Sequence, residues 1–224
     1  MRRLFDEELA DLDASFTEMG MLVSETIGKA VTSFINHDRQ TAQEIIDNDS
    51  QINQREVVLE KKTFEMIALY QPVTIDLREI VTVLKAVSEL ERMGDHARDV
   101  AEATIRVKGT KRSASIEKNI AQMGELSKTM VKEILSVYVK DDAQGASEIA
   151  KQNQAVTDMA HQVRNDVITQ IEDDAKLATS GTDYLMVAGH LKRISDYVTN
   201  IAEWIVYKRT GKIVDLNSGS SSFI

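Results

Sequence analysis

Hydrophobic residues recur along most of the chain with the spacing of one buried helical face. The first run follows the i, i+3, i+4, i+7 rule and contains Phe16, Met19, Leu22, Val23, Ile27, Ala30, Val31 and Phe34. A second run, from Ile45 to Ile67, stops before Gln71-Pro72, and a third extends from Leu77 to Ile105. Because Pro72 is the only proline among 224 residues, the pattern predicts long helices and few tight turns.

The three runs recur in the second half of the chain in the same order. A shift of 104 residues aligns Met19 with Met123 and Ile52 with Val156, and a shift of 101 aligns residues 90–95 with 191–196. Such a repeat predicts two tandem three-helix bundles, each antiparallel because its connections are short. We therefore expect an all-α protein of six helices in pseudo-symmetric halves. The bundles would span residues 1–108 and 114–210, followed by a flexible serine-rich tail at 211–224.

The net charge of −9 and the absence of cysteine narrow the possible functions. A nucleic-acid-binding face needs a basic patch, and the longest basic cluster, residues 106–112, is short. Without cysteine there is no disulfide, zinc finger or catalytic thiol. The N-terminal residues turn acidic at once and have no apolar core, so we expect no signal peptide. No stretch approaches the ~18 apolar residues of a membrane span. We expect a cytoplasmic protein with no nucleic-acid partner and no direct membrane insertion.

Acidic residues fall on the same helical stripes as core residues. At about 100° per residue, one stripe of the second helix spans roughly 60° and one of the third roughly 80°. The second helix carries Asp49, Asn53, Glu56 and Glu60, and the third carries Glu91, Asp95, Asp99 and Glu102. Like charges at these spacings repel, and burying them unpaired is costly. A metal ion would offset that cost, and oxygen ligands suit Fe, Mn, Mg, Ca or Zn.

The alternative is a solvated acidic face paired with Lys85, Arg92 and Arg98. The second half helps to separate the two interpretations, because its matching positions have lost most of their acids. They are Asn153, Thr157, Ala160, Arg164, Lys192, Asp196, Asn200 and Glu203. A uniformly solvated face has no reason to change so selectively. We therefore predict a metal site in the first half formed by Asp49, Asn53, Glu56, Glu91, Asp95 and Asp99. A weaker or absent second site would involve Asp196 and Asn200.

The histidines add little to this prediction. His96 lies about 100° from Asp95 around the helix, so we expect it to point away from the Glu91–Asp95 stripe, at the surface. The less favoured alternative is that His96 is a metal ligand. His37, His161 and His190 have no partner histidine at i+3 or i+4, which excludes a zinc enzyme of the His-Glu-x-x-His type.

Four segments of the chain resemble the PhoU family. They are residues 90–102, which begin Leu-Glu-Arg-Met-Gly-Asp, and residues 49–53, 70–78 and 191–204. The family carries a Glu/Asp-x-x-x-Asp motif in each half, and the resemblance covers about residues 5–210. The first motif is intact as Glu91 and Asp95. In the second, Lys192 stands where an acid is expected, and Asn153 replaces an expected aspartate.

The resemblance implies a tandem three-helix-bundle fold with multinuclear iron or zinc clusters on the motif faces. It implies repression of the phosphate-starvation response through two partners, the sensor histidine kinase and the ATPase of the phosphate ABC transporter. It also implies a homodimer. We therefore expect a negative regulator of phosphate uptake and signalling that is not an enzyme and that binds iron or zinc in its first half.

Two other functions remain open. One is a carboxylate-bridged di-metal protein akin to ferritin-like oxidases, which is disfavoured because neither acidic stripe contains Glu-x-x-His. The other is a helical adaptor without metal, which differs from the leading hypothesis in its metal content.

Overall fold

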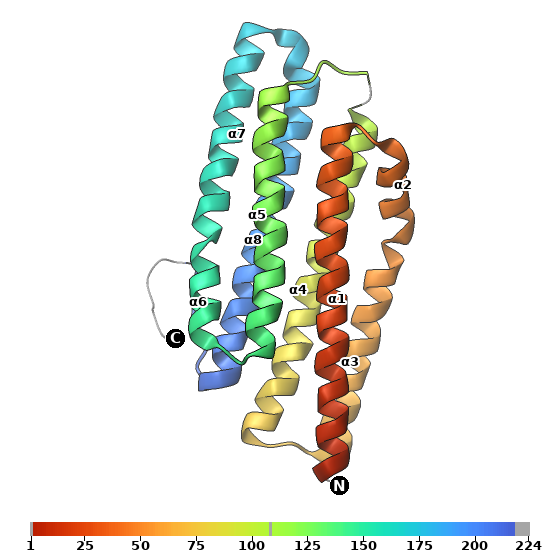
Figure 1. Ribbon diagram of the computed structural model, residues 1–224, viewed down its shortest axis with the longest axis vertical. Helices are drawn as coiled ribbons and strands as arrows, with labels where there is room; N and C mark the ends of the chain where they lie inside the picture. The colour runs from red at the N-terminus through yellow and green to blue at the C-terminus, as the bar shows by residue number, and fades with distance from the viewer. Residues whose placement is uncertain (1, 108, 218–224) are drawn as a thin grey trace.

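The computed structural model describes residues 2–107 and 109–217, and within them it is helical almost throughout (Figure 1). The first half contains α1 (Arg2–Asn36), α2 (Arg39–Asn48), α3 (Ser50–Tyr70) and α4 (Thr74–Arg106). The second half contains α5 (Ala114–Val139), α6 (Ala143–Lys151), α7 (Asn153–Asp173), a 3-10 turn (Ala175–Leu177) and α8 (Ala178–Thr210). The predicted all-α class is confirmed. No helix in the described ranges is long and apolar enough to cross a membrane.

The expected second helix of each half is divided into two segments. Asp49 separates α2 from α3, and Gln152 separates α6 from α7. Both residues keep right-handed helical dihedral angles, so the chain bends there without turning back. The first segments are capped in the same way, because the side chain of Asp38 accepts backbone hydrogen bonds at the start of α2 and that of Asp142 does so for α6. The six expected helices are thus present, with one bend in each half.

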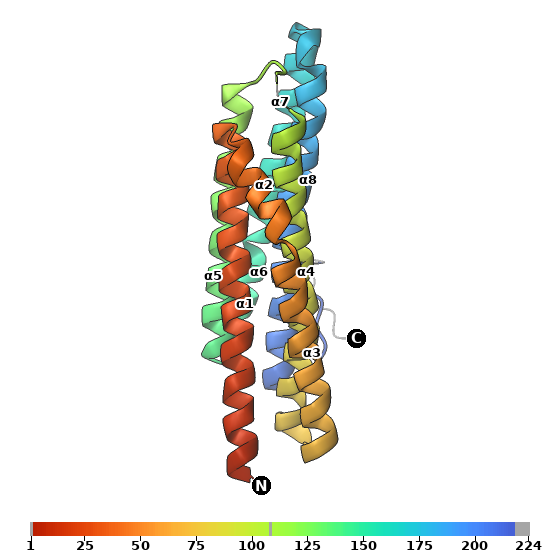
Figure 2. The same ribbon diagram turned by 90° about the vertical axis from the view of Figure 1, so that its right-hand side faces the viewer.

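The two halves lie side by side, with α1 against α5 and α4 against α8 (Figures 1 and 2). Reciprocal contacts reveal the pseudo-symmetry. A Cβ added to Gly20 of α1 would lie 2.4 Å from Leu135 of α5, and one added to Gly124 of α5 would lie 2.6 Å from Val31 of α1. Each residue of one pair is 104 positions from its counterpart in the other pair. The two glycines, which have no side chain, therefore let α1 and α5 approach each other closely at both positions.

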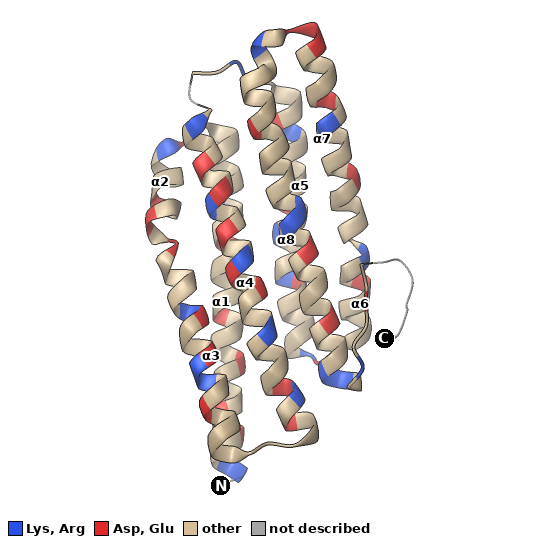
Figure 3. Ribbon diagram, turned by 180° about the vertical axis from the view of Figure 1, so that it is seen from behind, with Lys and Arg blue, Asp and Glu red and all other residues tan. Residues whose placement is uncertain are grey.

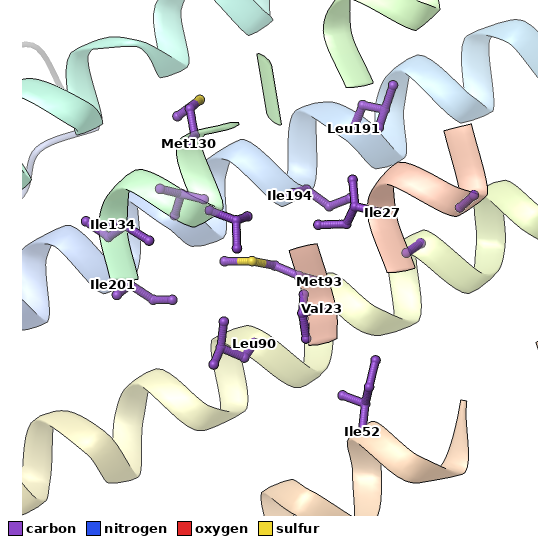
Figure 4. Packing of buried hydrophobic residues seen from close by; sticks show 14 of the residues in the cluster. Val23, Ile27, Ile52, Leu90, Met93, Met130, Ile134, Leu191, Ile194 and Ile201 are labelled. Carbon is purple, nitrogen blue, oxygen red and sulfur yellow. The ribbon is translucent and has the colours of Figure 1, made fainter. Parts of the chain in front are cut away.

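One hydrophobic core runs through both halves (Figure 4). Leu90 and Met93 of α4 point toward residues of α1, α5 and α8, and all of these side chains are fully buried. The partners shown are Val23, Ile27, Met130, Ile134, Leu191, Ile194 and Ile201. The boundary near residue 108 therefore marks the sequence repeat, while the apolar packing continues across it.

The predicted tail follows the left-handed Gly211 that ends α8. Its first residues are held against the second half, because the Leu216 N–H donates to Glu203 Oε1 at 2.8 Å. Leu216 also packs against the core. Residues 218–224, the rest of the predicted tail, lie outside the described residues.

A buried tyrosine anchors the end of the linker between the halves. The Tyr184 hydroxyl of α8 accepts from the Ser113 N–H at 2.8 Å and donates to Glu117 Oε1 at 2.8 Å. Arg112 joins the same group, because its guanidinium bonds to Glu117 and donates to the Phe34 carbonyl at 3.0 Å. The end of α1, the start of α5 and α8 therefore meet at one polar cluster.

Replacing Tyr184 with phenylalanine tests this anchor. The Tyr184→Phe substitution keeps the ring but leaves the buried Ser113 N–H without its acceptor, so we expect a loss of about 1–3 kcal/mol in unfolding free energy. Urea unfolding measures the loss. Tyr207→Phe is the matched control, because Tyr207 is partly exposed. Equal stability of the two variants would show that the hydroxyl contributes nothing.

Candidate metal centre

The predicted ligands of the first half line the contact between α3 and α4, but among the described residues no three of their carboxylates have ligand atoms within 4.8 Å of one another. Asp49, at the bend between α2 and α3, is followed one and two turns later by Asn53 and Glu56, while Glu91 and Asp95 lie one turn apart on α4. All five side chains are partly buried. Figure 3 shows acidic residues recurring along α4 where it passes α2 and α3.

Gly94 allows the two helices to approach closely at this point. A Cβ at Gly94 would lie 2.9 Å from Cδ1 of Ile52, which is itself buried against α4 (Figure 4). Gly94 directly precedes Asp95, and Ile52 directly precedes Asn53. The close contact therefore fixes the spacing between the polar residues on the two helices.

The carboxylates of this cluster repel one another. Burial raises the pKa of Glu91 to about 7, with further increases from Asp95, Glu56 and Asp49. Burial also raises the pKa of Asp49, and Asp95 adds to the effect. The pKa of Glu56 is likewise raised, first by burial and then by Glu60, against a hydrogen bond from Ser88. Each carboxylate thus makes ionisation of its neighbours less favourable.

Asn53 contributes an unsatisfied oxygen to the cluster. Its side chain bonds to Asp49, but its Oδ1 is buried and accepts no hydrogen bond from the residues that the structure describes. No donor among the described side chains reaches this oxygen. A cation would satisfy Oδ1 and offset the negative charge together.

Nearby basic side chains do not neutralise the cluster. Arg92 pairs with Glu89 at 3.4 Å, and Lys85 lies over the Trp204 ring, 5.9 Å from its centroid. Arg98 pairs with Glu102 at 2.9 Å, while its nearest approach to Asp49 is 3.9 Å. Within residues 2–107 and 109–217, neither Glu91 nor Asp95 forms an ion pair. These distances favour the metal hypothesis over a solvated, paired face.

Asp99 lies beside two histidines instead of joining the centre of the acidic cluster. Its Oδ2 is 3.6 Å from His96 Nδ1 and 3.4 Å from Nδ1 of His190 on α8. Burial lowers the pKa of both histidines, which favours the neutral imidazole. His96 was expected at the surface, but only 21% of its side chain is exposed, and its Nδ1 faces Asp99 of the acidic stripe.

Sequence reasoning missed this histidine pair because it searched within single helices. His190 reaches His96 across the contact between α4 and α8, with the two Nδ1 atoms 3.0 Å apart. The repeat gave no signal for the pair, because the shift of 101 aligns His190 with Glu89 and His96 with Tyr197.

In the second half, a lysine occupies the equivalent of the acidic cluster. The Lys192 ammonium lies 2.8 and 2.7 Å from the two oxygens of Asp196. Asn153 donates to Asp196 at 3.1 Å, and its own Oδ1 accepts from Ser195 at 2.6 Å. Asn200 donates to Glu89 at 3.2 Å. These contacts satisfy the groups of the weaker predicted site and oppose a cation there.

Comparison with known proteins matches the chain to one family. The PhoU domain family matches residues 16–104 and 120–205, one match for each half. Relatives called phosphate-specific transport system accessory protein PhoU homolog include one from Streptococcus pneumoniae. It is 36% identical over 97% of this chain and 100% of its own length. One from Clostridium acetobutylicum is 34% identical over 96% of this chain and 99% of its own length.

Two solved structures share the fold. A phosphate transport system regulatory protein PhoU from Streptococcus pneumoniae superimposes with a TM-score of 0.89 at 34% identity. The alignment covers 94% of this chain and 99% of that one. PhoU from Pseudomonas aeruginosa gives a TM-score of 0.86 at 30% identity over 92% and 99% of the two chains.

The raised pKa of Glu91 predicts a pH dependence of stability in metal-free protein. The folded state holds the Glu91 proton up to about pH 7, and the unfolded state releases it near pH 4.5. Stabilisation from the protonated group is therefore complete below about pH 4.5 and is lost as the pH rises through 7. Glu91→Gln should remove this loss. Because Glu91 is partly open to solvent, screening reduces the expected gain at pH 8 to about 1 kcal/mol.

Urea unfolding of chelator-treated protein between pH 5 and 8 would measure the difference. Glu65→Gln is the control, because Glu65 is an exposed acid on the far side of α3 from the cluster. A stability difference between wild type and Glu91→Gln that stays constant over this range would contradict the prediction.

Proposed function

The chain belongs to the PhoU family, and from this premise we propose that it is a negative regulator of phosphate uptake and of the phosphate-starvation response. The single observation that carries the proposal is the match, over nearly the whole chain, to relatives named as accessory proteins of the phosphate-specific transport system. In this proposal the protein is cytoplasmic and homodimeric, and it catalyses no reaction. It acts by contact with the transporter's ATPase and with the phosphate-sensing histidine kinase.

The proposal includes iron or zinc bound by the acidic cluster. Asp49, Glu56, Glu91 and Asp95 supply carboxylates, and the unsatisfied Oδ1 of Asn53 supplies a fifth oxygen. Asp99 lies at the edge of the set, close enough to Asp49 to raise its pKa. A set made only of oxygen atoms suits a hard cation. The ion would supply the positive charge that the neighbouring arginines do not.

An exposed apolar face on α3 supports contact with a protein partner. Val57, Val58, Phe64 and Leu69 are 61%, 64%, 57% and 73% exposed. The repeat shift of 104 aligns them with His161, Gln162, Ile168 and Asp173 of α7. Because α7 folds in the same way with a mostly polar face, the fold itself does not require these apolar side chains. We assign this face of α3 to the ATPase of the transporter.

Metal content tests the role of the acidic cluster. Protein without a histidine tag should carry about one or more iron or zinc ions per chain by plasma mass spectrometry, and Glu91→Gln/Asp95→Asn should lose them. Both substitutions keep the side-chain shape and remove charge. The control, Glu125→Gln/Glu148→Gln, removes two exposed acids from the second half and should retain the metal. Wild-type protein without metal would leave the helical adaptor as the better interpretation.

A charge placed on the apolar face of α3 tests the docking proposal. Phe64→Asp should weaken binding of the purified ATPase by at least about tenfold, because an unpaired carboxylate would be buried in the contact. Cells relying on this variant should take up more phosphate in phosphate-rich medium than cells with the wild type. Ile168→Asp changes the equivalent residue of α7 and should leave both measurements unchanged. A Phe64→Asp variant that binds and represses normally would exclude this face.

A further inference from the structure

Three potential metal ligands converge where α4 of the first half meets α8 of the second. The Nδ1 atoms of His96 and His190 lie 3.0 Å apart, and Asp99 Oδ2 lies 3.6 and 3.4 Å from them. Among the residues that the structure describes, these three form the one group of at least three histidine or carboxylate side chains whose ligand atoms all lie within 4.8 Å of one another.

We propose that His96, Asp99 and His190 form a zinc site that links the two halves of the protein. It differs from the acidic cluster in its chemistry, because imidazole nitrogens suit Zn²⁺ and similar transition metals, whereas oxygen atoms alone suit harder ions. It also differs in its position, because one ligand comes from the second repeat. The site does not depend on metal binding by the acidic cluster, although Asp99 lies between the two.

The distances fit a zinc ion. A triangle with edges of 3.0, 3.4 and 3.6 Å has room for an ion about 2.0 Å from each corner, which is the usual length of Zn–N and Zn–O bonds. The three ligand atoms thus occupy one face of a tetrahedron with little rearrangement. An open zinc site has three protein ligands and a fourth position for water.

The surroundings leave that fourth position accessible and restrain one of the rings. The side chains of His96 and His190 are 21% and 19% exposed, and that of Asp99 is 38% exposed. The Tyr197 ring stacks on His96 with centroids 5.6 Å apart and an interplanar angle of 14°. The imidazole is therefore held in place while its Nδ1 faces the other ligands.

A hydrogen bond between two neutral histidines explains only part of this arrangement. One Nδ1–H could donate to the other Nδ1 at 3.0 Å. That bond uses the single proton that the two Nδ1 atoms share, so Asp99 Oδ2 would face both nitrogens without receiving it. A metal ion engages all three atoms at once.

The pseudo-symmetric position in the other half provides a comparison. The shift of 101 aligns His96 with Tyr197, Asp99 with Asn200, and Glu89 with His190. There, Asn200 donates directly to Glu89 at 3.2 Å, so an amide and a carboxylate satisfy each other. At the pseudo-symmetric position, Asp99 instead faces the imidazoles of His96 and His190. The contact between α4 and α8 thus contains a hydrogen-bonded Asn200–Glu89 pair at one position and three potential metal ligands at the pseudo-symmetric position.

Zinc titration of the full chain, without a tag and after chelator treatment, tests the site. The acidic cluster is first neutralised with Glu91→Gln/Asp95→Asn, so that the result does not depend on whether that cluster binds metal. This parent should bind about one Zn²⁺ per chain by calorimetry. Adding His96→Gln/His190→Gln should weaken binding more than about 100-fold, because losing even a ligand's supporting hydrogen bond costs 10–100-fold. Adding His37→Gln/His161→Gln removes the other two histidines and should change nothing.

Nuclear magnetic resonance of the wild-type protein provides a second test, which does not depend on whether any variant folds. Zinc should shift the imidazole signals of His96 and His190 and leave those of His37 and His161 in place. The proposal is overturned if the parent binds no zinc, if both histidine double variants bind zinc equally well, or if the signals of His96 and His190 do not move.

Discussion

The packing of α4 against α8 determines the rest of the structure. Each is the last helix of its repeat, and both are buried along most of their length. Charged groups in this contact must find partners, because an unpaired buried charge is strongly destabilising. Glu79 pairs with Lys208 at 2.6 Å near one end, and Arg106 pairs with Asp183 at 3.1 Å near the other. These pairs fix the register in which Asp99 meets His190 and Glu89 meets Asn200.

The shared core explains how one half can carry a destabilising feature. Partly buried carboxylates that raise one another's pKa reduce the stability of the folded state at neutral pH. The cluster nevertheless lies on α3 and α4, which both pack against α1, and α4 contributes fully buried apolar side chains to the core that it shares with α8. Groups that lower stability in this way are characteristic of functional sites. The proposed cation would remove the repulsion when it binds, so metal occupancy and stability would be linked.

Sequence periodicity predicted the helices and the repeat because both follow from which residues are apolar. It could not predict the bends at Asp49 and Gln152, because neither residue is a strong helix breaker and the apolar pattern continues across both. The acidic stripe was likewise predictable within single helices, but the proximity of Glu56 to Glu91 across α3 and α4 emerges only from the structure. The contact of His96 with His190 was not, because it depends on the register of two helices about 94 residues apart in sequence.

The second half shows what the first half needs at its acidic cluster. Asp196 lies at the position of Asp95, and it is held by the ammonium of Lys192, which replaces Glu91. Replacing one acid of the pair with lysine turns repulsion into a salt bridge and removes any need for an ion. The same fold therefore balances this position in two ways. In the second half the positive charge is part of the chain and permanent. In the site proposed for the first half, the charge would instead be a cation taken up from solution.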